Sequence, residues 1–170
     1  LGEELKRLHK EFFETSEKKE KDKLKEQIEK MEWDLIEATL KEQRKEAELK
    51  KLEKFKKSKS KPFFLWQLNF AEVFEKGGFD IVIANPPYVR QEEINYKLAL
   101  QKEYTIFNSV SDLYTYFYER GFSLLKNSGT LSFITSNKFL RARYGVVLRK
   151  YLKINTTIKS IINFGNQHIF

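Results

Sequence analysis

One short stretch constrains the fold of this chain more than any other. The apolar, β-branched run Phe79–Ala84 is followed directly by Asn85-Pro86-Pro87-Tyr88. Such a run predicts a buried strand, and the two prolines cannot continue it because they lack the N–H that a sheet ladder needs. A polar amide, a stiff turn and an aromatic ring therefore stand at the carboxyl end of a strand. Open α/β sheets bind their ligands at that edge.

The segments after this turn alternate between helix and strand. Their apolar patterns predict a helix over 111–126, a strand over 130–135, a helix over 137–151 and a strand over 157–164. Such an order implies right-handed crossovers and a largely parallel sheet. We expect an α/β fold with about three strands and flanking helices, half of a doubly wound domain. Because so thin a sheet leaves an edge exposed, the rest of the protein or a second copy of the chain should cover it.

Residues 1–61 have a different character. They hold 19 Lys/Arg and 16 Asp/Glu, and neither glycine nor proline occurs between Glu3 and Lys61. Two apolar stripes with spacings of three and four residues predict amphipathic helices, and Thr15 or Ser16 between them could cap the second helix. The stripes are Leu1, Leu5, Leu8 and Phe12, then Leu24, Ile28, Met31 and Leu35. We expect a long charged helical hairpin over 1–61, with one continuous helix as the alternative, and a separate α/β unit over 62–170.

Composition narrows the chemistry. The chain has no cysteine, and its two histidines, His9 and His168, lie in different contexts, so we expect no metal site. It has no run of 18 apolar residues and no signal peptide, which predicts a cytoplasmic protein without a membrane partner. A net charge of +8 suits a polyanionic partner. Because the chain begins at Leu1 and ends at Phe170 just after a strand-like run, we expect it to be a piece of a longer protein.

The turn after the first strand could hold a planar amino group. The side-chain oxygen of Asn85 and the carbonyl oxygen of Pro86 can together accept both hydrogens of an –NH2 group, while Pro87 stiffens the backbone. Tyr88 offers a flat face on which a base could stack, worth roughly 1–3 kcal/mol. An exocyclic amine is a poor nucleophile because its lone pair is delocalised into the ring. Two acceptors that draw its hydrogens out of the ring plane restore the lone pair, so that it could attack a methyl donor without a carboxylate base or a metal.

Several segments resemble a known enzyme family. Residues 79–88 look like motif IV of S-adenosylmethionine-dependent amino-methyltransferases, and residues 112–117 and 124–130 resemble motifs V and VI of the γ-class DNA adenine-N6 methyltransferases. The aromatic stretch 63–74 is similar to the fused restriction-modification enzymes of type IIG. The lysine-rich helices resemble the insertion that such enzymes carry before motif IV. The resemblance covers residues 63–170 in the family's order.

This resemblance implies a partial Rossmann-like methyltransferase fold and a role for each matching residue. The turn would bind the amino group of a flipped adenine, two aromatics would lie against the base, and motif V would line the S-adenosylmethionine pocket. The implied residues are Asn85, Pro86, Pro87 and Tyr88 at the amine, Tyr88 and Phe170 against the base, and Asp112, Leu113 and Tyr114 on the cofactor side.

One feature of the family is missing. Its members bind S-adenosylmethionine through a Gly-x-Gly turn after their first strand, and this chain contains no Gly-x-Gly sequence. We therefore expect the main cofactor-binding motif and the target-recognition domain to lie outside the chain. The chain alone should then be inactive, as a catalytic-site fragment of its parent enzyme.

Simpler interpretations exist for some of these residues. Asp112 could equally cap a helix, and Phe170 could be an ordinary packing residue. We expect Asp80 to pair locally or to bind backbone amides. A basic cluster after the second strand could contact DNA phosphates or form a solvated helix face. The cluster comprises Lys138, Arg141 and Arg143, which we take as the phosphate candidates, and Arg149, Lys150 and Lys153.

The leading hypothesis is a fragment of a site-specific DNA adenine-N6 methyltransferase that uses S-adenosylmethionine and acts on double-stranded DNA. Protein-glutamine and some RNA amino-methyltransferases carry the same Asn-Pro-Pro-Tyr turn and are the first alternative. The second is a non-catalytic helical interaction module with a passive α/β cap. We also expect the fragment to self-associate, through the hairpin or through the exposed sheet edge.

Overall fold

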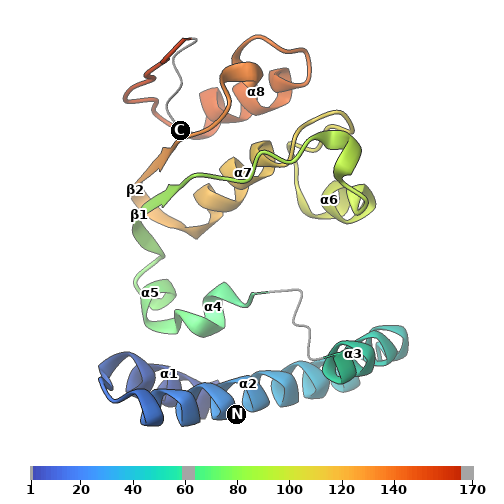
Figure 1. Cartoon of the computed structure of the whole chain (residues 1–170), viewed down its shortest axis with the longest axis vertical. Helices are drawn as coiled ribbons and strands as arrows, with labels where there is room; N and C mark the ends of the chain where they lie inside the picture. The colour runs from blue at the N-terminus through green and yellow to red at the C-terminus, as the bar shows by residue number, and fades with distance from the viewer. Residues whose placement is uncertain (1, 59–63, 166–170) are drawn as a thin grey trace. The chain divides into compact units, whose positions relative to one another are not determined.

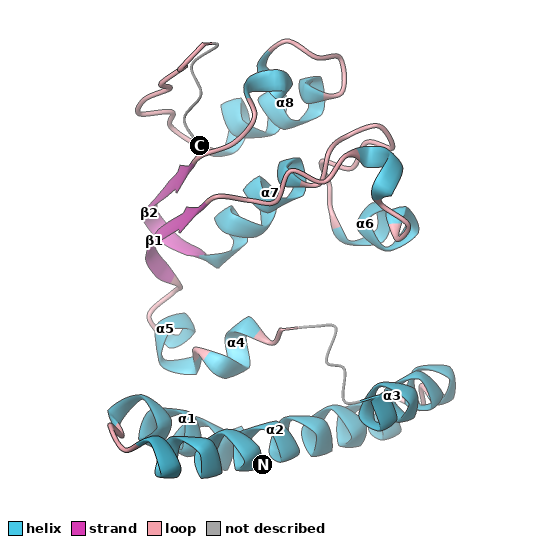
Figure 2. Ribbon diagram, in the orientation of Figure 1, coloured by secondary structure: helices cyan, strands magenta, loops and turns pink. Residues whose placement is uncertain are grey.

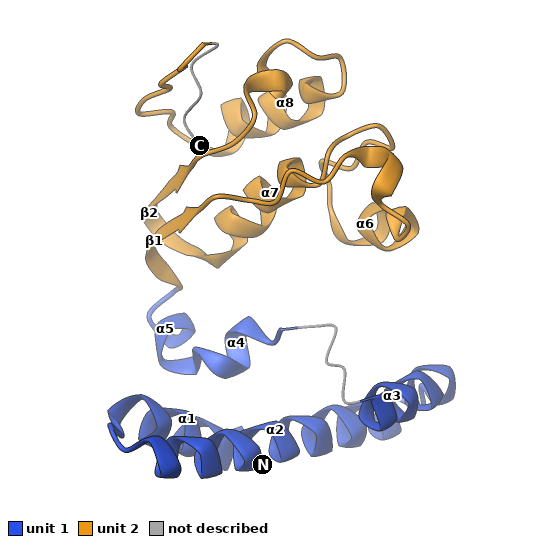
Figure 3. Cartoon of the chain, viewed as in Figure 1, with its two compact units in different colours: residues 1–77 blue, residues 78–170 orange. Residues whose placement is uncertain are grey.

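The structure is a computed structural model, and it describes residues 2–58 and 64–165. The chain forms two compact units, Leu1–Gly77 and Gly78–Phe170, which Figure 3 shows in different colours. The first unit is helical, and the second combines helices with a small parallel sheet (Figure 2). The α/β class predicted from the sequence is thus present, although the sheet has two strands among the described residues.

The first unit is built on a helical hairpin. Its first two helices pack against each other and are joined by the short break at residues 15–17 (Figure 1). The apolar stripes meet in the hairpin core, where Leu5, Leu8, Leu24 and Ile28 are buried. Neither Thr15 nor Ser16 caps the second helix, because its N-cap position is Glu17 and no side-chain cap bond forms. The helices of this unit are α1 (Gly2–Glu14), α2 (Lys18–Glu42), α3 (Glu46–Ser58), α4 (Trp66–Asn69) and α5 (Ala71–Glu75).

A third helix, α3, follows the hairpin without any glycine or proline between it and α2. The chain turns instead at Arg44, whose φ of 55° places a non-glycine residue in the left-handed region. Glu37 on α2 joins the two helices, since its carboxylate lies 2.5 Å from Lys56 of α3 and 2.6 Å from Lys41. Hydrogen bonds from these two ammonium groups lower the pKa of Glu37 from its ordinary 4.5 to about 2.

The aromatic segment after residue 63 packs within this first unit. Trp66 and Phe70 stack with centroids 5.9 Å apart, and Phe70 lies 6.0 Å from the Phe13 ring of α1. Asn69 donates a 2.7 Å hydrogen bond to the buried Glu32 carboxylate of α2. Residues 64–77 therefore belong with the helices. The division at residues 61 and 62 stays a prediction about the domains of the whole protein.

The second unit begins with the predicted strand β1 (Phe79–Ala84), which pairs in parallel with β2 (Leu125–Phe133). Helix α7 leads into β2 and packs close against the sheet at Gly121, where an added Cβ would come 2.9 Å from the Phe133 ring. The opposite face is bare, because the side chains of Ile81 and Ile83 are 64% and 75% exposed. The helices of this unit are η1 (Gln91–Glu93), α6 (Lys97–Glu103), α7 (Tyr114–Leu124), η2 (Asn137–Leu140) and α8 (Gly145–Asn155).

Three predicted elements differ from the structure. The second strand starts at Leu125 and not at 130, so the helix predicted over 111–126 ends at Leu124. The helix predicted over 137–151 is divided into η2 and α8. Residues 157–164 are not a strand, and that prediction is wrong. Apolar alternation alone makes no strand, and within the described residues this exposed segment forms no ladder with β2.

The core of the second unit lies around α7 and α8. Its fully or nearly buried side chains come from helices and loops that are far apart in sequence: Ile94, Leu100, Ile106, Tyr114, Tyr116, Phe139, Leu148 and Leu152. This core supports the carboxyl ends of both strands. Among the described helices of both units, none is long and apolar enough to cross a bilayer.

Candidate active site

Residues 85–88 lie where the two parallel strands end. The Ile134 amide donates a 3.0 Å hydrogen bond to the carbonyl of Ala84, so the carboxyl ends of β1 and β2 are side by side. Pro86 is fully buried and fixes the turn to the body of the unit, whereas Asn85, Pro87 and Tyr88 are exposed. A buried proline between exposed neighbours holds the turn in one conformation while leaving the Asn85 amide accessible.

The two predicted acceptors differ in exposure, because Asn85 is exposed and Pro86 is fully buried. Among the described residues, none donates a hydrogen bond to the Asn85 side chain or to the Pro86 carbonyl. An amino group that enters from solvent can reach the exposed Asn85 side chain. The turn therefore presents the Asn85 amide at a strand end, while the joint action of Asn85 and the Pro86 carbonyl stays a prediction.

The segment after Tyr88 is held by the start of α7. The Leu113 amide donates to the Val89 carbonyl at 2.9 Å, and the Gln91 amide donates to the Asp112 Oδ1 at 3.2 Å. The Asp112 side chain makes no cap bond to α7, whose N-cap position is Leu113. The structure thus places two predicted cofactor-side residues, Asp112 and Leu113, as a clamp on the chain that leaves the turn.

Tyr114, the third predicted cofactor-side residue, lies beneath Tyr88. It is fully buried, with its ring centroid 6.5 Å from that of Tyr88 and 6.4 Å from that of Phe139. Its hydroxyl lies 3.1 Å from the Tyr144 hydroxyl. Burial raises the pKa of both Tyr114 and Tyr144, so both phenols stay neutral at physiological pH. Sequence reasoning missed Tyr144, because nothing in the pattern before α8 marks that residue as a neighbour of the turn.

These three residues already have contacts within the unit. The Asp112 carboxylate accepts a backbone amide through Oδ1, and the Tyr114 hydroxyl is buried against another tyrosine. The cofactor-side role of Asp112, Leu113 and Tyr114 stays a prediction.

The basic cluster divides into exposed and structural members. Lys138, Arg141 and Arg143 are exposed, and within the described part of the chain the two guanidinium groups form no hydrogen bond or ion pair. Arg149 is different, because its Nη1 donates to the carbonyls of Phe139 and of Ala142, the latter at 3.1 Å. Arg149 thus stabilises the turn on which Lys138, Arg141 and Arg143 lie, and its guanidinium group is not free to contact a phosphate.

Other predicted residues fall outside the turn. Asp80 forms an ion pair with Lys126 of the neighbouring strand β2, a residue distant in the chain, and this pairing lowers the pKa of the Asp80 carboxyl. Phe170 and His168 lie outside the described residues. Within residues 2–58 and 64–165, no group of three His, Cys, Asp or Glu side chains could hold a metal ion.

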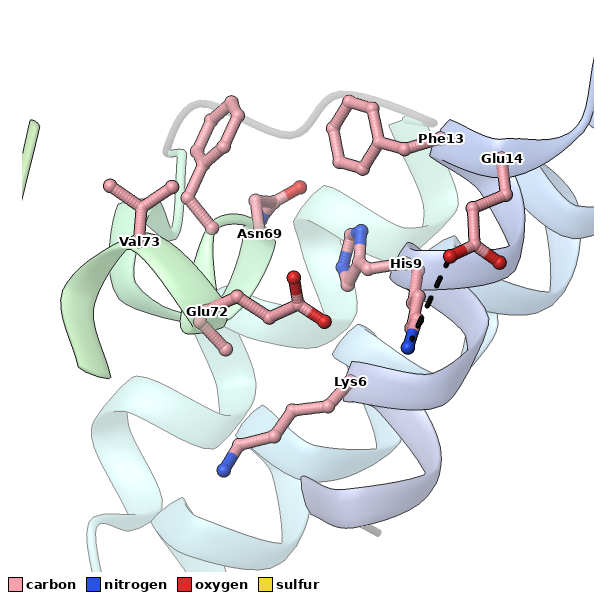
Figure 4. A pocket seen from close by; sticks show the side chains of 10 residues that line it. Lys6, His9, Phe13, Glu14, Asn69, Glu72 and Val73 are labelled. Carbon is pink, nitrogen blue, oxygen red and sulfur yellow. Dashed lines mark ion pairs between the residues drawn. The ribbon is translucent and has the colours of Figure 1, made fainter. Parts of the chain in front are cut away.

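A pocket of about 330 Å³ lies in the first unit, between α1 and the short helices α4 and α5 (Figure 4). Its wall combines aromatic rings with charged groups, among them Phe13, His9 and Glu72, and Lys10 pairs with Glu14 across 4.0 Å. None of the residues predicted for the active site lines it.

Sequence comparison relates the chain to restriction-modification enzymes. The family described as Eco57I restriction-modification methylase matches residues 3–170. Type II methyltransferase M.BstVI of Geobacillus stearothermophilus is 40% identical over 103 residues, which are 59% of this chain and 18% of the relative. Type II restriction enzyme and methyltransferase RM.Eco57I of Escherichia coli is 33% identical over 101 residues, 54% of this chain and 10% of the relative.

A third relative, Type II methyltransferase M.PaeR7I of Pseudomonas aeruginosa, is 38% identical over 97 residues, 56% of this chain and 17% of the relative. The chain therefore spans less than a fifth of each of these three proteins. No solved structure is significantly similar to it.

Proposed function

Because the chain belongs to the Eco57I restriction-modification methylase family, we propose that it carries the target-amine site of a DNA adenine-N6 methyltransferase. The observation that carries this proposal is the turn at Asn85 and Pro86. Asn85 stands exposed at the joined ends of two parallel strands, and neither its side-chain oxygen nor the carbonyl oxygen of the buried Pro86 accepts a hydrogen bond from a described residue. Relatives with names of type II methyltransferases support the same class of reaction.

The turn at Asn85 and Pro86 would activate the amino group of adenine, which is the nucleophile. The Asn85 Oδ1 and the Pro86 carbonyl oxygen accept the two N6 hydrogens of an adenine that has been rotated out of the duplex. These bonds favour a tetrahedral nitrogen, whose lone pair is then localised and can attack a methyl carbon. S-adenosylmethionine supplies that electrophilic methyl group when it is bound in the whole protein. In the transfer the nitrogen lone pair would form the new N–C bond, the sulfur of the donor would keep the electron pair of the broken S–C bond, and the nitrogen, now positively charged, would lose one proton to water.

Tyr88 and the exposed basic residues would bind the DNA. The half-exposed Tyr88 ring is the stacking face for the flipped base, worth roughly 1–3 kcal/mol. Lys138, Arg141 and Arg143 stand on the turn that follows the end of β2 and would contact phosphates. We place the parent among the type IIG restriction-modification enzymes, with S-adenosylmethionine bound mainly by residues outside this chain.

Methyl transfer by the full-length protein tests this function. Labelled S-adenosylmethionine is offered with double-stranded DNA, RNA or a glutamine-containing peptide, and the modified product is identified after digestion. We expect N6-methyladenine in DNA. Transfer to RNA or to the peptide but not to DNA would overturn the assignment of the substrate.

The matched variants are Asn85→Ala and Asn127→Ala. Asn127 is also exposed, but it lies near the amino end of β2, at the opposite end of the sheet from the turn. Removing one preorganised hydrogen-bonding group at a reacting centre costs about 10²–10³-fold in kcat, so Asn85→Ala should lose that much and Asn127→Ala almost nothing. Equal rates for the two variants would show that Asn85 is not the acceptor. We also expect calorimetry to detect no S-adenosylmethionine binding by residues 1–170 alone.

A further inference from the structure

Tyr144 lies at the junction between the basic turn and helix α8. It is the residue before Gly145, where α8 begins, and it follows Arg141-Ala142-Arg143 directly. Its half-buried hydroxyl lies 3.1 Å from the hydroxyl of Tyr114, which is fully buried. The hydrogen bond therefore links the loop that displays two free arginines to the first residue of α7.

Tyr114 is the ring on which Tyr88 rests. The two centroids lie 6.5 Å apart with the planes inclined by 43°, and Phe139 contacts Tyr114 from another side at 6.4 Å. Tyr88 itself is 52% exposed, so about half of the residue faces solvent while its ring keeps the contact with Tyr114. A stacking face keeps a fixed direction only if the ring that supports it is fixed as well.

The hydroxyl pair fixes Tyr114. A tyrosine side chain rotates about two bonds, and its hydroxyl lies on the axis of the second. A hydrogen bond to the hydroxyl therefore restrains rotation about the first bond, which sets the position of the ring between Tyr88 and Phe139. Since burial raises the pKa of both phenols, the pair stays neutral and the bond persists across the physiological pH range.

We propose that Tyr144 and Tyr114 are positioning residues for Tyr88, through which contact of the Arg141–Arg143 turn with DNA phosphate is coupled to the stacking of the flipped base. This role rests on the proposed function. When the basic turn is seated on the backbone, Tyr144 is held, Tyr114 is held by Tyr144, and Tyr88 presents its face to the base. The phosphate contact and the stacking of the base are thereby positioned relative to each other.

The test compares Tyr144→Phe and Tyr114→Phe with Tyr116→Phe in the full-length protein. Tyr116 is a matched control, because it belongs to the same helix, is also buried, and donates its hydroxyl to a backbone carbonyl, that of Asn108, at 2.9 Å. Each variant removes one buried hydroxyl and keeps the ring. Thermal unfolding of all three shows whether any of them has lost its fold.

Single-turnover methyl transfer and DNA binding are then measured separately. Misplacement of a group at a reacting centre can cost up to about 10²-fold, so we expect Tyr144→Phe and Tyr114→Phe each to slow transfer by about tenfold. DNA affinity should change less than about twofold, because phosphate contacts dominate it. With 2-aminopurine at the target position, both variants should show reduced fluorescence enhancement. Tyr116→Phe should match the wild type in all three measurements.

The decisive experiment combines Tyr144→Phe with Tyr88→Ala in one protein. If the hydroxyl pair acts through Tyr88, Tyr144→Phe will slow transfer no further in a protein that already lacks the Tyr88 ring. An equal loss with and without Tyr88, or a Tyr144→Phe rate equal to that of Tyr116→Phe, overturns the positioning role while leaving the proposed function intact. A wild-type protein that transfers no methyl group to DNA overturns the proposed function and this role together.

Discussion

Gly145 is the position where the second unit should be least tolerant of a single added methyl group. An ideal Cβ there would lie 2.7 Å from the carbonyl carbon and 2.8 Å from the Cα of Phe139, and closer still to its carbonyl oxygen. Real Cβ atoms essentially never approach within 3.0 Å of other atoms. Because the obstacle is backbone and not the end of a flexible side chain, Gly145→Ala must displace the 139–142 turn from the start of α8.

The loss of folding free energy follows from the contacts that the 139–142 turn makes. Overpacking of this kind costs about 1–3 kcal/mol. Arg149 donates hydrogen bonds to the Phe139 and Ala142 carbonyls, and weakening charge-assisted bonds adds about 1.5–3 kcal/mol. Alanine returns at most about 1 kcal/mol through its better helix propensity. We expect a net destabilisation of roughly 2–4 kcal/mol, in which the steric conflict outweighs the propensity gain.

Amide hydrogen exchange measures this locally. Peptides from α8 should exchange about 30- to 1,000-fold faster in Gly145→Ala, since each 1.4 kcal/mol corresponds to a tenfold change. Gly2→Ala is the control, because Gly2 also begins a helix but has nothing within 4 Å of the added Cβ. Unchanged exchange of α8 in Gly145→Ala would refute the reasoning, and so would equal effects of the two substitutions on their own helices.

Three further outcomes follow from contacts described above. As the pH falls from about 4.5 to 2, protonation of Glu37 should release α3 from α2. The pKa of Glu37 is lowered in the folded protein, so the ionised carboxylate stabilises the fold above pH 4.5 and this contribution is lost toward pH 2. Glu37→Gln and Lys56→Gln should each weaken the pH dependence of the melting temperature measured by circular dichroism. Asp112→Ala should leave the fold intact but speed exchange of the Gln91 amide, and an unchanged rate would contradict the clamp. Gly78→Ala should lower the melting temperature, because Gly78 has a φ of 121° and its Cβ would meet the Leu124 carbonyl at 2.7 Å.

The sequence predicted correctly those parts of the fold that depend on residues close together in the chain. The run 79–84 forms β1 because β-branched apolar residues suit a strand, and Pro86 and Pro87 end it. The two leucine-rich stripes of residues 1–35 form the hairpin because their spacing places them on one face of each helix. The family resemblance based on residues 63–170 is confirmed by the match over 3–170.

Other features depend on contacts between distant residues. Residues 157–164 have the apolar composition of a strand, but a strand exists only where a second strand supplies hydrogen bonds. The break between α2 and α3 occurs at Arg44, a residue type that rarely adopts a positive φ. In the candidate site, the turn itself was predicted, whereas the support of Tyr88 by Tyr114 and Tyr144 joins residues 26 to 56 positions apart in the chain and leaves no local signal.

The parallel pairing of β1 with β2 also has a consequence during synthesis. β2 ends 49 residues after β1, so the ribosome completes the first strand well before its only described partner exists. At about 5–20 residues per second, the backbone of β1 would stay unpaired for roughly 2–10 s. That interval is long enough for a nascent-chain chaperone to bind. We therefore expect the yield of folded protein to depend more strongly on the supply of chaperone for the whole chain than for the helical first unit expressed alone.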